Sequence, residues 1–600
     1  MSTVGGKIIY SFTGIPFAQP PLGNLRFKRT SPVQPWSGTL YATDGNKPCI
    51  QPNFYNPTSR LRIGSEDCLY LNIFTSQISS IGDQVGHEQP GDDEERRKPV
   101  VVFIHGGAFV IGSNDDRLYG PEILMDKDIV LVCINYRLGP LGFLSLETDA
   151  CPGNLGLHDQ YLALEWIKNN IAFFNGDADN ITLMGESAGA MSALLHSVSP
   201  FSKHLFHKII ALSGTPSTVF LKPNRSPRLY AHALAQKLGC KEDDPSKVLE
   251  FLQEQKVSNI LKHCMMFKDW DYPTPQPWLP IQDNFATLPF LPISFQDAVN
   301  SKLASPKAVL YGLCKDEGLF LTSSFYKENR RINVLAEQWQ EWAPLLFLHK
   351  ERDLCTETDL DSANKICQHY FEQRGISLDK TSLPVLKEIF SMGFFVYPLV
   401  EDATVMSSNN WDVWIMRLSV PTEFSLMHVV KSPFHKFCLK MAAHAFGAKQ
   451  FDKKYGVCHG DDLFYLFSFN IPGMPQAVKS KDQKFARSTL LSSISSFTAQ
   501  SQPLEDYHHH KAKPKKSANE IEKNPPNLEK CALKLCNTAA DIDLIEIMPD
   551  QQIKLSPLPQ SELHKDLHFW HDIYIRDKDR SYSVKQISKL HNTVVPFRVE

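Results

Sequence analysis

The motif Gly185-Glu186-Ser187-Ala188-Gly189 has the form Gly-x-Ser-x-Gly, and its residue types point more directly to chemistry than any other part of the chain. It stands between a short apolar run and a segment with helical character. At such a strand-to-helix turn, the residues two before and two after the serine must be small because larger side chains would collide with the neighbouring backbone. The motif therefore predicts an exposed nucleophile at Ser187, with the Ala188 amide free to bind an oxyanion.

The segment IHGGAF, at positions 104–109, predicts the other half of an oxyanion hole. Its glycines would let the backbone approach a substrate closely and direct N–H groups at the negative charge that develops there. A single donor of this kind contributes about 3 kcal/mol. Alone, the segment would be interpreted as a glycine turn after a strand. Together with the serine motif, it leads us to expect donors at Gly107, Ala108 and Ala188.

A serine nucleophile also needs a base and a carboxylate that orients the base. In this kind of fold the acid and then the histidine follow the serine along the chain. Asp316 and Glu317 come directly after the apolar run 308–312, where catalytic groups gather in open α/β sheets, and either could be the acid. Spacing does not choose among the histidines that follow, which include His349, His369, His428, His435, His444 and His459.

Short apolar runs rich in β-branched residues alternate with helical segments, which predicts an α/β protein with a mostly parallel sheet. Between Leu157 and Ile171, apolar residues recur at steps of four, three, three and four, as on one face of a helix. The expected strands are 100–104, 129–134, 181–184, 208–212, 308–312 and 413–418.

The composition of the chain disfavours several classes of function. The 600 residues carry 63 basic and 66 acidic side chains, a net charge of -3, so nothing favours nucleic acid as a partner. The apolar stretches are interrupted short of the roughly 18 to 20 residues that a membrane span needs, and we expect no transmembrane segment. The thirteen cysteines form no CxxC pair, so we expect no compact zinc site.

Two polar, charged segments, 77–97 and 500–530, are predicted to be solvated insertions. The second contains three consecutive histidines, His508, His509 and His510. Side chains on consecutive residues diverge, so a mobile tract is favoured over a metal site.

Several blocks of the chain, in this order, resemble those of the type-B carboxylesterases, the branch of the α/β-hydrolase fold that includes the cholinesterases. The blocks are YSFTGIPFAQPPLGNLRFK, SEDCLYLNIF, VVVFIHGGAFVIGS, INYRLGPLGFLS, GNLGLHDQYLALEWIKNNI and ITLMGESAGAMS. The resemblance implies one α/β-hydrolase domain over residues 1–600: a large, mostly parallel twisted sheet flanked by helices, with helical and loop insertions around a catalytic gorge.

The blocks KDEGLF and YGVCHGDDLFYLF are similar to those that hold the family's acid and base. The resemblance thus implies a triad of Ser187, Glu317 and His459. It implies a serine carboxylesterase that hydrolyses small-molecule carboxylic esters, including xenobiotic esters, through an acyl-enzyme on Ser187, without a metal or organic cofactor.

The resemblance also implies a disulfide between Cys49 and Cys68, and Cys240 and Cys264 lie near the family's second disulfide region. The chain carries no secretory signal, which favours the cytoplasm, whereas a disulfide is typical of an oxidising compartment and fits a secreted protein whose N-terminus is missing.

Of two glycosylation sequons, the one at Asn180 leads into an expected strand and is predicted to be buried. We expect the other, at Asn224, to be the more accessible site if the protein is secreted.

Departures from the family bear on the substrate. Cholinesterases carry a tryptophan in the first disulfide loop that binds quaternary ammonium, and 51–67 contains none, which disfavours choline esters. Juvenile hormone esterases typically have glutamine before the nucleophile, whereas this chain has Glu186, which favours a general esterase. Two alternatives stay open: a scavenger that binds esters or organophosphates and deacylates slowly, and a neuroligin-like binding module, which the complete triad disfavours.

Overall fold

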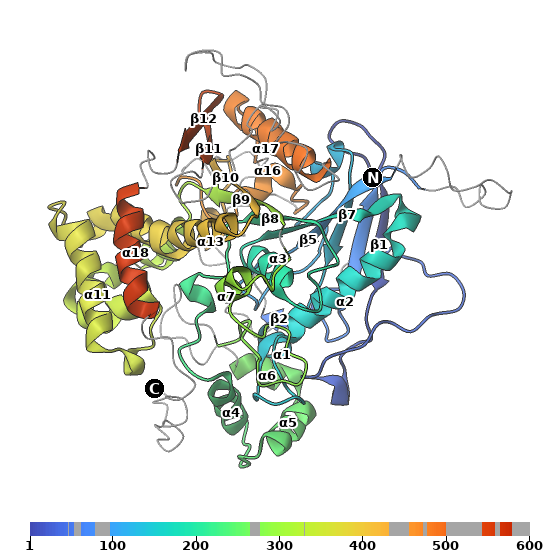
Figure 1. Ribbon diagram of the computed structural model, residues 1–600, viewed down its shortest axis with the longest axis horizontal. Helices are drawn as coiled ribbons and strands as arrows, with labels where there is room; N and C mark the ends of the chain where they lie inside the picture. Colours follow the sequence, from blue (N-terminus) through green and yellow to red (C-terminus); the bar gives the residue numbers. More distant parts are fainter. Residues whose placement is uncertain are drawn as a thin grey trace.

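The computed structural model describes residues 1–45, 47–52, 62–78, 97–263, 277–305, 307–328, 330–430, 455–471, 477–499, 543–557 and 564–578. Within these residues a ten-stranded sheet runs through the molecule in the order β1-β4-β6-β5-β7-β8-β9-β10-β11-β12 (Figure 1). Neighbouring strands from β6 to β11 pair in parallel, while β1, β4 and β12 join the two edges antiparallel. The α/β architecture expected from the sequence is therefore confirmed.

All six expected strands are present, as β5 to β10, and β7 extends beyond the expected 181–184 at both ends. The sheet consists of β1 (Tyr10–Pro16), β4 (Tyr70–Thr75), β5 (Lys98–Ile104), β6 (Val130–Ile134), β7 (Gly176–Glu186), β8 (Lys208–Leu212), β9 (Ala308–Cys314), β10 (Asp412–Leu418), β11 (Asp543–Met548) and β12 (Gln552–Pro557), and β2 (Gln51–Pro52) pairs with β3 (Arg62–Ile63) outside it. β1, β4 and the hairpin β11–β12 were not among the expected strands, and the hairpin is separated from the rest of the sheet in sequence by a long polar stretch.

Both faces of the central strands are buried. Along β5, Val100 and Val102 belong to a core that includes residues of helices α2 and α3, whereas Val101 and Phe103 belong to a second core that includes residues of α17. This two-sided burial explains why the central strands are continuous apolar runs instead of alternating ones. The helix expected between Leu157 and Ile171 is α2.

The helices of the described residues surround this sheet (Figure 1). They are α1 (Gly139–Phe143), α2 (Leu155–Asn170), α3 (Ala188–Val198), α4 (Pro227–Lys237), α5 (Pro245–Glu254), α6 (Val257–His263), α7 (Phe295–Asn300), α8 (Leu319–Lys327), α9 (Arg330–Glu337), α10 (Trp339–Leu348), α11 (Glu357–Cys367), α12 (Leu383–Ser391), α13 (Tyr397–Ser408), α14 (Leu426–Val430), α16 (Leu463–Leu466), α17 (Lys481–Ala499) and α18 (His564–Lys578).

One helical run in the described part of the chain, Lys380–Ser408, is long and apolar enough to cross a membrane by length and composition alone. It contains α12 and α13, and 78% of its most apolar window is buried inside the protein. Helix α18 packs against it: the Trp570 ring would lie 2.4 Å from a Cβ on Gly393, and the Tyr574 hydroxyl donates to the Gly393 carbonyl. This packing is typical of a core helix.

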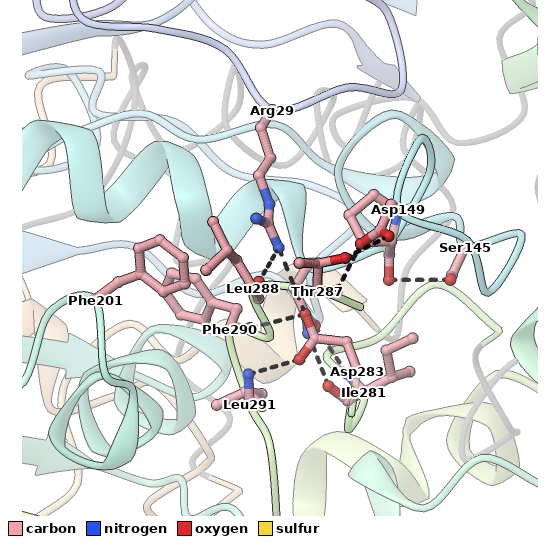
Figure 2. A network of polar contacts seen from close by, with 12 residues as sticks. Arg29, Ser145, Asp149, Phe201, Ile281, Asp283, Thr287, Leu288, Phe290 and Leu291 are labelled. Atoms are coloured by element: carbon pink, nitrogen blue, oxygen red, sulfur yellow. Dashed lines mark hydrogen bonds and ion pairs between the residues drawn. The ribbon is translucent and has the colours of Figure 1, made fainter. Parts of the chain in front are cut away.

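A polar network fixes the segment around residues 281–291 to the body of the protein (Figure 2). Arg29 donates to the Leu288 carbonyl and lies 4.0 Å from Asp283. The buried Asp283 carboxylate accepts hydrogen bonds from the amides of Phe290 and Leu291 at 2.9 and 2.7 Å. Burial raises the pKa of Asp283 despite these bonds. Because these donors and acceptors pair with one another, the loop keeps its position although it forms no helix or strand.

The disulfide between Cys49 and Cys68 is present. The sequon residue Asn180 is buried and accepts from Lys208, as expected, whereas Asn224 is partly exposed and donates to the His349 carbonyl. Cys264 and the whole of 500–530, including His508–His510, lie outside the described residues, as does nearly all of 77–97.

Candidate active site

Ser187 lies at a sharp turn between β7 and α3. Its backbone has φ 54° and ψ -120°, a conformation that non-glycine residues rarely adopt and that only a well-packed surrounding maintains. A Cβ on Gly185 would lie 2.2 Å from the Gly189 carbonyl, and a Cβ on Gly189 would lie 1.9 Å from the Ile104 carbonyl oxygen. The turn therefore requires the glycines that the motif supplies, and it leaves Ser187 partly exposed in a cavity.

His459 and Glu317 meet close to this turn. The Nδ1 atom of His459 lies 2.7 Å from Oε2 of Glu317, and both side chains are buried. Glu317 follows β9, and its other oxygen accepts from the Cys314 amide at 2.7 Å and from the Ser213 hydroxyl at 2.6 Å. These donors fix the carboxylate and, through it, the imidazole ring. Sequence reasoning did not identify Ser213, whose partner is 104 residues away in the chain.

Asp316 and His428, two other candidates for acid and base, face elsewhere, and the candidates His435 and His444 lie outside the described residues. Asp316 forms an ion pair with Lys387 and accepts from the Val457 amide, so its carboxylate supports the chain just before His459 instead of contacting the ring. His428 lies against the Ser425 backbone and stacks on Phe424. Adjacent positions such as Asp316 and Glu317 direct their side chains to different partners, and this difference is invisible in sequence spacing.

Glu186 is a second carboxylate beside the imidazole. Its Oε1 lies 3.2 Å from Nε2 of His459. Burial is the main cause that raises the pKa of Glu186, to about 7. Burial also opposes the charged form of His459, but Glu186 and then Glu317 outweigh it and raise the pKa of His459 to about 9. The site therefore favours an imidazolium strongly, a role that the sequence motif alone did not assign to Glu186.

The segment 106–112 passes over the serine turn. Gly107 has φ 114° and Ala108 has φ 53°, and both residues line the cavity that contains Ser187. Within the described part of the chain, the amides of Gly107 and Ala108 have no hydrogen-bond acceptor. Ala188 is the first residue of α3, where an amide has no partner within the helix. The expected donors are thus available to a ligand.

The cavity has a volume of about 740 Å³. Ser187, Glu186, His459, Gly107 and Ala108 form part of its wall. Much of the remaining wall is apolar, with Ile63, Ile111, Leu118, Phe320, Leu426, Leu463, Phe464 and Phe469. This lining suits an uncharged organic ligand with apolar groups. Among the described residues, no group of three or more His, Cys, Asp or Glu side chains could hold a metal ion.

The chain resembles known esterases over most of its length. A model of the carboxylesterase family matches residues 1–538. The chain is 30% identical to venom carboxylesterase-6 of Apis mellifera over 507 residues, which cover 83% of each chain. It is 29% identical to juvenile hormone esterase of Tribolium castaneum, over 82% of this chain and 80% of that one.

A solved structure agrees with these sequence matches. The crystal structure of juvenile hormone esterase from Manduca sexta, with OTFP covalently attached, superimposes with a TM-score of 0.72 and 25% sequence identity over 96% of this chain and 97% of that one. The fold expected from the family resemblance, the α/β-hydrolase fold, is confirmed by this match. On the strength of the family model and of the relatives, the chain belongs to the carboxylesterase family.

Proposed function

We propose that this protein is a serine esterase in which Ser187, Glu317 and His459 form the catalytic triad and Gly107, Ala108 and Ala188 bind the oxyanion. Hydrolysis of carboxylic esters is the activity of the family. The observation that carries the residue assignment is the 2.7 Å contact between His459 Nδ1 and Glu317 Oε2, at a cavity whose wall also includes Ser187.

In the acylation step, His459 removes the hydroxyl proton of Ser187 as the oxygen attacks the ester carbonyl. The carbonyl oxygen becomes negatively charged and is stabilised by the amides of Gly107, Ala108 and Ala188. The carboxylate of Glu317 keeps the ring in the required tautomer and stabilises the imidazolium. When the tetrahedral species collapses, the C–O bond to the alcohol breaks, and the imidazolium returns the proton to the leaving alkoxide oxygen.

In the deacylation step, His459 removes a proton from water, and the resulting hydroxide attacks the acyl carbon. The same amides hold the second oxyanion. Collapse breaks the bond to Ser187 Oγ, which takes the proton back from the imidazolium, and the carboxylic acid leaves. Together the two steps consume the ester and one water molecule and release an alcohol and a carboxylic acid, so atoms and charges balance without a cofactor.

The cavity supports a substrate class of uncharged esters with apolar acyl or alcohol groups, including xenobiotic esters. Phe320 and Phe395 pack on the His459 ring, with ring centroids 5.5 and 4.9 Å from its centroid, and present apolar surface to the base. Venom carboxylesterase-6 and the juvenile hormone esterases carry esterase names, which agrees with an ester as the substrate.

We propose further that residues 1–600 form one domain with solvated insertions at 77–97 and 500–530. What supports this is the central sheet, whose strands come from between Tyr10 and Pro557. The contacts of Glu317 with Ser213 and with His459 likewise require distant segments to fold together.

The test compares the wild-type protein with Ser187→Ala on p-nitrophenyl acetate and butyrate, following both the initial burst and the steady state. We expect a steady turnover in the wild type and its loss in Ser187→Ala. Equal rates in the two proteins would rule out the mechanism. A burst without turnover would favour the slow-deacylating scavenger, and no labelling of Ser187 by a fluorophosphonate would favour a binding module.

A further inference from the structure

Gln51 is a buried polar side chain that the steps above do not use. It is 2% exposed and lies two residues after Cys49, inside the loop that the disulfide with Cys68 closes. It also forms part of the wall of the cavity that contains Ser187. A buried side-chain amide needs partners for both of its ends, so its partners show what it holds.

The amide group of Gln51 binds both backbone groups of one residue. Its Oε1 accepts from the Gly112 amide at 2.7 Å, and its Nε2 donates to the Gly112 carbonyl at 2.7 Å and to the Cys49 carbonyl at 2.9 Å. Gly112 is 61 residues away in sequence. The side chain therefore joins the disulfide-closed loop to the end of the segment 106–112.

The peptide that Gln51 binds packs against the first expected oxyanion donor. The Gly112 amide belongs to the peptide whose carbonyl is that of Ile111, and this carbonyl oxygen would lie only 2.0 Å from a Cβ on Gly107. In addition, the amides of Val110 and Ile111 donate to the Gly107 carbonyl at 3.0 and 3.1 Å. A displacement of the 111–112 peptide would therefore move Gly107.

The segment needs such support because its backbone is strained. Gly107 and Gly112 have φ values of 114° and 120°, and the two residues Ala108 and Phe109 have φ values of 53° and 62°. For residues with a side chain, the left-handed region is sterically unfavourable, and such conformations persist only where surrounding contacts enforce them. Besides Gln51, the Gly139 amide supports the segment by donating to the Phe109 carbonyl.

We propose that Gln51 is a positioning residue of the oxyanion hole. It fixes the 111–112 peptide, and thereby the amides of Gly107 and Ala108, in the place where the carbonyl oxygen of the ester becomes negatively charged. Its own position is fixed by the Cys49 carbonyl and hence by the disulfide. This inference rests on the proposed function, because it assigns Gln51 a task only if these amides bind an oxyanion.

The main test is Gln51→Met, which keeps the length of the side chain and removes its hydrogen bonds. Because a misplacement of about 1 Å can cost about 100-fold in rate, we expect kcat for p-nitrophenyl acetate to fall roughly 10- to 100-fold, with little change in KM. Inhibition by a trifluoromethyl ketone, which forms a tetrahedral oxyanion adduct, should weaken by a similar factor.

The matched control is Gln483→Met. Gln483 is 1% exposed, accepts from the amides of Lys479 and Ser480, and donates to the Pro421 carbonyl and the Glu423 carboxylate, and none of these residues lines the cavity. The control loses one side-chain hydrogen bond more than Gln51→Met, so it should lower the melting temperature while kcat and ketone inhibition stay at the wild-type values.

Rates are expressed per active site, counted by exhaustive labelling with a fluorophosphonate, so that loss of folded protein does not imitate loss of catalysis. An unchanged kcat per labelled site and unchanged ketone inhibition in Gln51→Met would overturn the inference, whatever happens to stability. If Gln51→Met yields no labelled protein, Gln51→Glu is measured in the same way. It keeps the acceptor for Gly112 but places a carboxylate at the Gly112 carbonyl, and the same fall is expected.

The failure of this inference differs from failure of the proposed function. If Ser187→Ala retains wild-type activity, the proposed mechanism is wrong and Gln51 has no oxyanion to position. If Ser187→Ala is inactive while Gln51→Met and Gln51→Glu both keep wild-type kcat per site, the mechanism stands and only the role of Gln51 is wrong.

Discussion

Glu186, the residue directly before the nucleophile, lies 3.2 Å from Nε2 of His459, on the opposite side of the ring from Glu317. The imidazole is therefore held between two buried carboxylates. Both favour its protonated form, which is the form that develops in the transition state. The same two negative charges also favour the protonated ring in the resting enzyme, where His459 must be neutral to act as a base. The pH at which the reaction slows therefore depends on Glu186.

Replacing Glu186 with glutamine should move the acidic limb of the kcat/KM profile to lower pH. Loss of the negative charge removes a contribution that raises the pKa of His459, so the ring stays neutral and able to accept the Ser187 proton down to a lower pH. A shift of about 1 pH unit is expected. The measurement is kcat/KM for p-nitrophenyl butyrate against pH, with the exposed Glu250→Gln as control. An acidic limb that stays in place or moves to higher pH would contradict the assignment.

Replacing Ser213 with alanine should lower kcat through Glu317. The 2.6 Å hydrogen bond from its hydroxyl goes to a buried carboxylate, and bonds of this charged kind contribute about 1.5–3 kcal/mol. A loosened Glu317 orients His459 less well, so kcat should fall roughly 10-fold with KM nearly unchanged. Steady-state kinetics measure this effect. Ser197→Ala removes a buried hydroxyl that donates to the Leu194 carbonyl, and it should leave kcat unaltered.

Two glycine substitutions separate steric overlap from backbone strain. Gly107 and Gly239 both have positive φ, 114° and 103°, but a Cβ on Gly107 would lie 2.0 Å from the Ile111 carbonyl oxygen, whereas a Cβ on Gly239 would meet nothing within 4 Å. Gly107→Ala should reduce kcat about 100-fold by displacing the oxyanion donors. Gly239→Ala should cost about 1 kcal/mol of stability and no activity. Similar kcat values for the two variants would show that the 106–112 segment is not part of the hole.

Loss of the disulfide should destabilise the protein. Cys49 and Cys68 are 19 residues apart, and closing a loop of that length contributes about 3 kcal/mol, mainly by restricting the unfolded chain. The paired replacement Cys49→Ser with Cys68→Ser should therefore lower the urea midpoint, measured by circular dichroism. Cys367→Ser, at a partly exposed free cysteine, should leave the midpoint nearly unchanged. Equal midpoints for the two variants would mean that the bond does not stabilise the fold.

The sequence by itself determined the features that depend on nearest neighbours in the chain. The serine turn could be predicted because its motif is contiguous in the chain, although the Ile104 carbonyl oxygen that requires Gly189 comes from a neighbouring strand. The strands could be predicted because burial on both faces produces continuous apolar runs. From the residues alone, the identity of the catalytic acid was undecided between Asp316 and Glu317, and the identity of the base was undecided among several histidines. The family resemblance pointed to Glu317 and His459, in the positions where the structure brings the two side chains together.

Only the tertiary structure decided which distant side chains meet. Ser213 reaches Glu317 across 104 residues and Gln51 reaches Gly112 across 61, and neither pairing leaves a periodic or local pattern in sequence. Glu186 could be identified as part of the motif, but its effect on His459 follows from burial and a 3.2 Å separation. Hydrogen bonds and charge interactions act over a few ångströms in space, so their partners are set by the packing of the sheet and its loops and not by the order of the residues.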